Sequence, residues 1–186
     1  MHPSPPDFSA VYDEHVWRVY GFLAYRVRSR ADAEDLTQLT FERALRAWGR
    51  YDSSRASPAT WLLVIARNLL VDHARADRSA AQRPVGDADD AALPSAWDRH
   101  DLGLDPGIEL ALAELSDQAR EVIGLRFGGD LTGPEIAALT GLSLANVQQI
   151  LSRALRQLRT SIEAAREATA VKSVEGAAHA MPAQRS

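Results

Sequence analysis

Apolar residues in the first part of the chain recur every three to four positions, which is the pattern of helices that bury one face. Ser29 predicts the cap of a second helix, which runs to about Trp48. Ser57 and Pro58 predict the start of a third helix, which continues to about Asp77. The stripe of the first helix holds Phe8, Val11, Tyr12, Val16, Val19, Tyr20, Leu23 and Val27.

The second half of the chain shows the same period. Asp105 and Pro106 predict the start of a short helix, and Ser116 predicts the cap of another. The latter is expected to stop at Gly128 and to carry Val122, Ile123, Leu125 and Phe127. Since no stretch alternates apolar and polar residues between turn signals, strands are not expected. The predicted fold class is therefore all-α.

Residues 79–105 separate the two helical parts and differ from them in composition. This stretch has few large apolar residues, two prolines and a cluster of aspartates. It buries too little apolar surface to offset the entropy lost on ordering, so we predict a flexible linker. The predicted organisation is two small helical domains, residues 8–78 and 106–162, and residues 163–186 are expected to form a disordered tail.

Residues 133–152 closely fit the pattern of a helix-turn-helix. Thr132 and Glu135 predict a capping box for the first short helix, and Gly141 supplies the backbone freedom that the turn requires. Ser143 then predicts the cap of the second helix. The buried face of this second helix is expected to consist of Val147, Ile150, Ala154 and Leu158.

The opposite face of the second helix carries amide, small and basic side chains: Ala145, Asn146, Gln148, Gln149, Ser152, Arg153 and Arg156. Asparagine and glutamine pair bidentately with adenine, and arginine pairs with guanine or phosphate. The pattern therefore indicates a helix that reads DNA. A helical hairpin that never contacts DNA is the alternative that the residues alone leave open.

The third predicted helix has a polar face with Arg67, Asn68, His73, Arg75 and Arg78. A polar loop at residues 51–57 precedes it, flanked by Trp48 and Trp61. Aromatic rings beside arginines suit single-stranded DNA, because the rings accept unstacked bases while the guanidinium groups follow the backbone. For any single residue of this face, simple solvation is the competing interpretation.

A polar and acidic face runs along the second predicted helix. It is formed by Asp32, Glu34, Asp35, Gln38 and Glu42. Such a face is either solvated or a docking surface for a basic partner, since complementary charge steers association.

Composition excludes several classes of protein. The 186-residue chain has no cysteine, so disulfides and thiolate metal sites are absent. No apolar run reaches the roughly 18–20 residues that a membrane span needs, so no membrane insertion is expected. The first residues lack the pattern of a secretory signal, and a soluble cytoplasmic protein is expected. The net charge of −4 does not by itself indicate a nucleic-acid partner.

Three motifs, in this order along the chain, resemble a known family. They are the stretch from Asp32 to Phe41, the residues Ala66-Arg-Asn68 with Asp72, and the helix-turn-helix. Together they resemble bacterial sigma-70-family sigma factors of the extracytoplasmic-function (ECF) group. The resemblance places sigma region two at about residues 8–78 and sigma region four at about 108–160. It implies a protein that binds core RNA polymerase, places it at promoter DNA and opens the DNA there.

The resemblance also implies roles for particular residues. Asp35, Gln38 and Glu42 would dock on the largest subunit of the polymerase. The residues expected to read the minus-ten element and capture a flipped base are Tyr51, Trp61, Arg67, Asn68, Arg75 and Arg78. The residues expected to read the minus-thirty-five element in the major groove are Ser143, Ala145, Asn146, Gln148, Gln149, Arg153 and Arg156. No catalytic residue, cofactor or metal is implied, and an anti-sigma factor is expected as an antagonist.

The chain departs from the family pattern at two positions. Leu39 stands where the family often has an acidic residue, and Gln148 stands where lysine or arginine is common. We therefore expect region four to grip phosphates more weakly or to prefer an unusual upstream sequence. Weaker phosphate contact would make DNA binding depend less steeply on salt concentration.

Two other classes of function compete with this interpretation. A sigma-like decoy would bind the polymerase or an antagonist, yet it would give no promoter-specific transcript with core polymerase. A small hydrolase would need a metal or a catalytic dyad. The five histidines are scattered and lack metal-ligand spacing, which disfavours the hydrolase.

Overall fold

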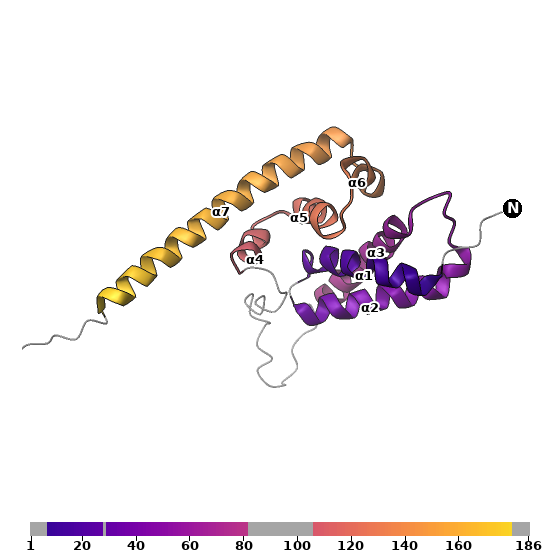
Figure 1. Ribbon diagram of the computed structural model, residues 1–186, viewed down its shortest axis with the longest axis horizontal. Coiled ribbons are helices and arrows are strands. Elements are labelled where there is room, and N and C mark those ends of the chain that lie inside the picture. Colours follow the sequence, from indigo (N-terminus) through magenta and orange to yellow (C-terminus); the bar gives the residue numbers. More distant parts are fainter. Residues whose placement is uncertain (1–6, 28, 82–105, 180–186) are drawn as a thin grey trace, which may run out of the picture.

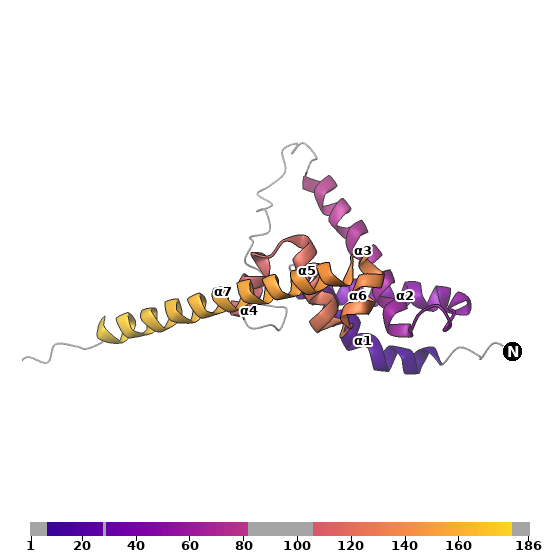
Figure 2. The same ribbon diagram turned by 90° about the horizontal axis from the view of Figure 1, so that it is seen from above.

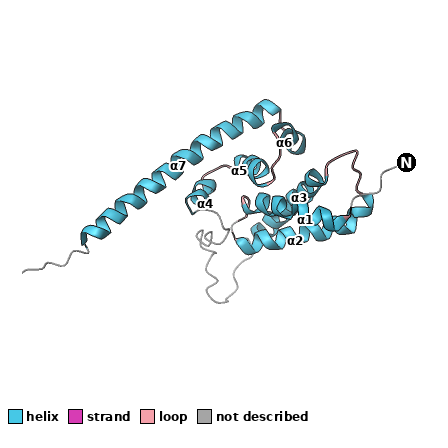
Figure 3. Ribbon diagram, in the orientation of Figure 1, coloured by secondary structure: helices cyan, strands magenta, loops and turns pink. Residues whose placement is uncertain are grey.

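The computed structural model describes residues 7–27, 29–81 and 106–179, and these residues form helices joined by short turns and loops (Figures 1 and 3). The first module, residues 7–81, contains α1 (Phe8–Ala24), α2 (Arg30–Ala47), the 3-10 turn η1 (Trp48–Arg50) and α3 (Pro58–Ala81). The second module, residues 106–179, contains α4 (Pro106–Ala113), α5 (Asp117–Ile123), the π-helical turn η3 (Gly124–Gly128), α6 (Gly133–Thr140) and α7 (Leu144–His179). The all-α prediction is confirmed for these residues.

Three predicted serine caps form as expected. The hydroxyl oxygen of Ser29 accepts from the backbone N–H of Asp32 at 3.1 Å, which starts α2. Ser57 caps α3 by accepting from the N–H of Thr60, and Ser116 caps α5 in the same way. Each cap satisfies a backbone donor that the first helical turn leaves unpaired, so the local sequence sets where these helices begin.

The three helices of the first module pack against one another in pairs, while α4, α5 and α6 of the second module all pack near or on α7. The two modules also share one apolar core, which differs from the predicted pair of separate domains. Phe22, Leu63 and Ala66 of the first module lie in the same buried cluster as Leu125 and Ile136 of the second. The contact runs mainly between α1 and η3, with α6 touching α3 (Figure 2).

Helix α7 is longer than the sequence analysis predicted. It continues to His179, so the expectation of a disordered tail is wrong for residues 163–179. The stretch is rich in alanine and glutamate, which favour helix, and it contains no proline. A side-chain contact also holds α7 just before this stretch, because the Ser161 hydroxyl donates to a carboxylate oxygen of Glu114 at 2.5 Å. Residues 180–186 lie outside the described residues, as does the predicted linker apart from residues 79–81, which extend α3.

Phe127 was expected on the buried face of its helix, but it is 53% exposed. The cause is the π-helical turn η3, in which Gly129 donates its N–H to the carbonyl of Gly124, five residues earlier. This wider turn accommodates an extra residue and shifts the residues that follow around the helix axis. The helical period of 3.6 residues therefore gives the wrong face for Phe127.

His15 is 5% exposed in α1, and its Nδ1 atom has no hydrogen-bond partner among the described residues. Burial lowers the pKa of His15 and Arg18 lowers it further, while Glu14 opposes the shift. The unfolded chain therefore binds a proton at a higher pH than the folded chain does. We expect the free energy of unfolding to be highest above pH 6.5, the ordinary value, and to fall as pH drops through the lowered pKa.

The variant His15→Leu removes this titration. Urea melts between about pH 7.5 and pH 5 should show a smaller loss of stability for His15→Leu than for the wild type over this range. Equal losses in the two proteins would show that His15 does not carry the effect.

Candidate nucleic-acid interface and docking groove

The helix-turn-helix forms with the predicted caps. Thr132 and Glu135 make the capping box at the start of α6, where the Thr132 N–H and hydroxyl both donate to one carboxylate oxygen of Glu135, at 2.8 and 2.6 Å. These hydrogen bonds lower the pKa of Glu135. Gly141 ends α6 with a φ of 76°, a left-handed conformation that glycine adopts without strain. Ser143 then caps α7 by accepting from the N–H of Asn146.

The first turns of α7 present the predicted outer face. Val147 and Ala154 are buried and Ile150 is half-buried, so the apolar side of the helix is occupied by the core. Asn146 is half-buried, and the exposed residues of the predicted set are Ser143, Ala145, Gln148, Gln149, Arg153 and Arg156. This face therefore offers amide donors and acceptors near the start of the helix and two guanidinium groups further along. That arrangement suits base edges and phosphates, respectively.

The aromatic residues around the 51–57 loop pack against one another. Trp48 and Tyr51 stack with ring centroids 4.6 Å apart and an interplanar angle of 4°, and Trp61 lies 5.2 Å from Tyr51. The hydroxyl of Tyr51 donates to the carbonyl of Ala56, which closes the loop. Burial, with a smaller effect of Asp52, raises the pKa of Tyr51. The three rings form a half-buried cluster at the start of α3.

The polar residues of α3 fall on two stripes. Trp61, Asn68 and Arg75 recur every seven residues and so lie on one side of the helix; Asn68 and Arg75 are exposed. Arg67 lies on a different side, where its Nε atom pairs with the carboxylate of Glu121 in α5 at 2.5 Å. This contact between the modules was not predicted, because Arg67 and Glu121 are 54 positions apart along the chain. Arg78 lies within α3, and its side chain is outside the described residues.

The predicted docking residues lie along the exposed side of α2. Asp35 and Gln38 are exposed, and the Gln38 amide donates to Glu42 at 3.0 Å. Glu42 also approaches Arg46 at 3.5 Å. Phe41, one position before Glu42, is 5% exposed and packs edge-to-face on Tyr12. Helix α2 thus has a polar side that faces solvent and an apolar side, with Phe41, that packs on α1.

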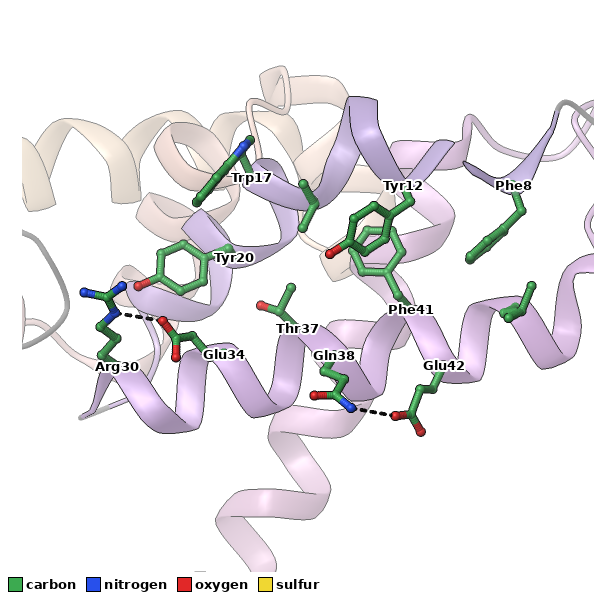
Figure 4. Close-up of a pocket in the computed structure, with 12 residues that line it drawn as sticks. Phe8, Tyr12, Trp17, Tyr20, Arg30, Glu34, Thr37, Gln38, Phe41 and Glu42 are labelled. Atoms are coloured by element: carbon green, nitrogen blue, oxygen red, sulfur yellow. Dashed lines mark hydrogen bonds and ion pairs between the residues drawn. The ribbon is translucent and has the colours of Figure 1, made fainter. Parts of the chain in front are cut away.

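A groove of about 840 Å³ lies between α1 and α2 (Figure 4). Its aromatic wall comes from α1, and its polar wall comes from Glu34, Gln38 and Glu42 of α2. Trp17 is 77% exposed, a large fraction for an indole ring. Phe8, Tyr12 and Tyr20 were predicted to lie on the apolar stripe of this helix, whereas Trp17 was not part of that stripe. The aromatic wall consists of Phe8, Tyr12, Trp17 and Tyr20.

Among the described residues, no group of three histidine, aspartate or glutamate side chains is placed to hold a metal ion. Within the same residues, every helix is too short or too polar to cross a membrane. The features that remain are therefore surfaces: the α7 face, the α3 stripe with its aromatic cluster, and the groove beside α2.

Comparison with known proteins identifies both modules. The family model of sigma-70 region 2 matches residues 11–80, and that of sigma-70 region 4 matches residues 111–160. The ECF RNA polymerase sigma factor BldN of Streptomyces coelicolor is 34% identical over 154 residues, which cover 81% of this chain and 58% of that protein. The chain thus spans less than two thirds of that relative. The ECF RNA polymerase sigma factor RpoE of Cereibacter sphaeroides is 31% identical over 159 residues, covering 85% and 87% of the two chains.

Two solved structures share the fold. The sigma factor RpoE of Bartonella quintana, solved in complex with the anti-sigma factor NepR, matches with a TM-score of 0.65 at 23% identity, covering 84% of this chain and 97% of that one. CnrH, solved with the cytosolic domain of CnrY, matches with a TM-score of 0.58 at 23% identity, covering 84% and 88%. The two region matches and the identity to curated relatives lead to one conclusion: the chain belongs to the ECF group of the sigma-70 family of RNA polymerase sigma factors.

Proposed function

We propose that this chain binds core RNA polymerase, directs it to promoters and helps to separate the DNA strands there. The observation that carries the proposal is that one chain combines a correctly capped helix-turn-helix with an arginine-bearing helix beside an aromatic cluster, in sigma regions 4 and 2. The polymerase supplies the chemistry, so we assign no catalytic residue, cofactor or metal to this chain. Its place of action is the cytoplasm, where it meets the polymerase.

The polymerase-docking surface consists of Asp35, Gln38 and Glu42 together with the groove beside them. The acidic side chains of α2 attract a basic partner surface, which raises the rate of encounter. The exposed aromatic groove then offers apolar area, and buried aromatic anchors supply most of the affinity in protein interfaces. A partner helix with an apolar stripe and basic flanks fits both requirements.

Mixing the chain with core polymerase and measuring their affinity tests this docking surface. The double variant Asp35→Ala, Gln38→Ala is expected to bind at least about tenfold more weakly, since each truncated contact at a protein interface costs on the order of 1 kcal/mol. DNA binding by α7 should be retained. Gln118→Ala, which removes an exposed amide from α5, is the matched control. Unchanged affinity in the double variant would exclude this side of α2 as the docking face.

Region 4 reads the minus-thirty-five element through the outer face of α7. Asn146 and Gln149 lie in the first two turns, where side chains of a recognition helix reach base edges. Arg153 and Arg156 lie further along and contact phosphates. Gln148 stands where the family commonly has lysine or arginine, so this face has one positive charge fewer. The affinity for DNA therefore falls less steeply with salt concentration than it does for those family members.

The double variant Asn146→Ala, Gln149→Ala is expected to lose upstream sequence preference by about tenfold or more per base position read, because a bidentate amide contact discriminates by about 1–3 kcal/mol. Binding to polymerase should not change. Selection of bound promoter fragments from a randomised library measures this preference. Gln157→Ala is the control on the same helix, because the Gln157 amide donates to the carbonyl of Glu114. Wild-type preference in the double variant would contradict the assigned face.

Region 2 reads and holds the minus-ten element. Asn68 and Arg75 lie on the same side of α3 as Trp61, whose ring is 5.2 Å from that of Tyr51, and Arg67 and Arg78 belong to the same helix. The aromatic edges accept an unstacked base, which lowers the cost of strand separation, and the guanidinium groups follow the backbone. An anti-sigma factor completes the set of partners, as the structure of the similar protein RpoE in complex with the anti-sigma factor NepR suggests.

A further inference from the structure

Helix α3 exposes two valines on the side that points away from the core. Val64 is 41% exposed and Val71 is 44% exposed, and neither belongs to the buried cluster that the helix helps to form. At 3.6 residues per turn, the packing face of α3 lies on the opposite side of the helix. That face is formed by five buried residues: Leu62, Leu63, Ala66, Leu69 and Leu70.

Valine at positions 64 and 71 does not stabilise the fold. A β-branched side chain loses rotamer freedom in a helix, so an exposed valine destabilises a helix relative to alanine or leucine. An exposed apolar side chain also gains nothing from the hydrophobic effect until a partner covers it. One exposed apolar residue is ordinary on a protein surface, but Val64 and Val71 recur two turns apart on the same side of α3. This repeat indicates an apolar contact with a partner outside the fold.

The valines alternate with polar residues that are proposed to contact the minus-ten element. One stripe along α3, at steps of four, three and four residues, contains Val64, Asn68, Val71 and Arg75. All four side chains are exposed. At a rise of 1.5 Å per residue, the stripe is about 16 Å long. A DNA strand that follows Asn68 and Arg75 along this stripe therefore also covers the two valines.

The chemistry of the DNA bases limits what a valine is able to recognise. The base edges carry hydrogen-bond donors and acceptors, and their one apolar substituent is the C5-methyl group of thymine. Between the two valines, Asn68 offers an amide that pairs with adenine, and beyond them Arg75 pairs with phosphate or guanine. The stripe thus suits an element that contains thymine and adenine. Such an element also unstacks readily, because TA steps are easily deformed.

We propose that Val64 and Val71 recognise thymine in the minus-ten element through its C5-methyl group. This inference rests on the proposed function and names the chemical group that region 2 selects. Valine is stiff in a helix, so little side-chain entropy is lost when the methyl group binds. With one valine on either side of Asn68, the two contacts fix the register of the element along α3. Arg67 lies outside this stripe, since it pairs with Glu121 on another side of the helix.

Uracil tests this contact directly, because it differs from thymine only by the missing methyl group. The probe is a promoter fragment identified by transcript-start sequencing, synthesised with thymine or with uracil in its minus-ten element. It is titrated with the complex of this chain and core polymerase. The wild type should lose affinity by about fourfold for each contacted methyl group that is removed. Uracil placed between the two promoter elements is the control and should leave the affinity unchanged.

The double variant Val64→Ala, Val71→Ala should bind the thymine promoter about tenfold more weakly and should no longer distinguish thymine from uracil. Its fold should be retained, because both side chains are exposed and alanine favours helix. Leu110→Ala, which truncates an exposed leucine of α4, should distinguish the two bases as the wild type does. An equal uracil effect in the double variant and the wild type would overturn the proposal. Weaker binding of the double variant to polymerase without DNA would also overturn it, because the valines would then contact the polymerase.

Failure of this inference can be told apart from failure of the proposed function. If the wild type gives promoter-specific transcripts but binds thymine and uracil promoters equally, thymine recognition by the valines is wrong and the proposed function stands. If the wild type gives no promoter-specific transcripts, the proposed function is wrong and thymine recognition falls with it.

Discussion

Phe22→Ala is expected to lower the free energy of unfolding by about 3–5 kcal/mol, the range for truncating a buried phenylalanine. Phe22 is fully buried and belongs to the core that the two modules share. Its ring lies beside Gly124 of η3, where a Cβ atom would come within 3.4 Å of it. The cavity would therefore weaken the packing of α1 and the contact with the second module together.

Urea melts followed by circular dichroism measure the size of this effect, and hydrogen exchange in α5 and α6 shows whether the second module takes part. Phe127→Ala is the matched control, because Phe127 is a half-exposed phenylalanine of η3. This variant should lower the free energy of unfolding by less than about 1 kcal/mol. Amides of α5 should exchange faster in Phe22→Ala. A loss below about 1 kcal/mol, or unchanged exchange in α5, would contradict the shared core.

Trp17→Ala is expected to weaken binding to core polymerase by about 30-fold, which corresponds to the roughly 2 kcal/mol of an aromatic hot spot. Trp17 is 77% exposed and lines the groove between α1 and α2. It packs on Tyr20 alone among the other aromatic rings of the described residues. Because the ring is mostly in solvent, the variant should leave the free energy of unfolding almost unchanged.

Leu110→Ala is the control for this variant. Leu110 is also exposed, at 39%, but it belongs to α4 and does not line the groove. Titration of labelled chain with core polymerase gives both affinities. If Trp17→Ala and Leu110→Ala bind equally well, the groove is not part of the docking surface. If Trp17→Ala instead loses stability, its ring supports the fold rather than a partner.

The helix starts and the helix-turn-helix could be predicted because local interactions set them. Ser29, Ser57 and Ser116 each cap a helix through a hydroxyl that lies three residues from the N–H it accepts. Thr132 with Glu135 does the same for α6, and Gly141 takes the left-handed conformation that the turn needs. Both partners of such a contact lie within a few residues of each other, so the contact can be predicted from a single sequence.

The contact between the modules could not be predicted because its partners are far apart along the chain. Arg67 and Glu121 are 54 positions apart, and Arg18 and Asp130 are 112 apart. From the sequence alone, each of these charged residues is expected to be solvated. The exposed position of Phe127 also escaped the sequence pattern, because a π-helical turn changes the period locally. Arg67 was predicted to share a polar face with Asn68 and Arg75, but it lies on another side of α3, where it pairs with Glu121 through the tertiary fold.

Transcription with purified core polymerase on fragmented genomic DNA, followed by sequencing of the transcript starts, measures whether this chain directs promoter-specific initiation. With this chain added, we expect starts that share two upstream motifs, near minus ten and minus thirty-five. The Asn146→Ala, Gln149→Ala variant should keep the first motif and lose the second. Starts that match those of core polymerase alone, with or without the chain, would contradict the account.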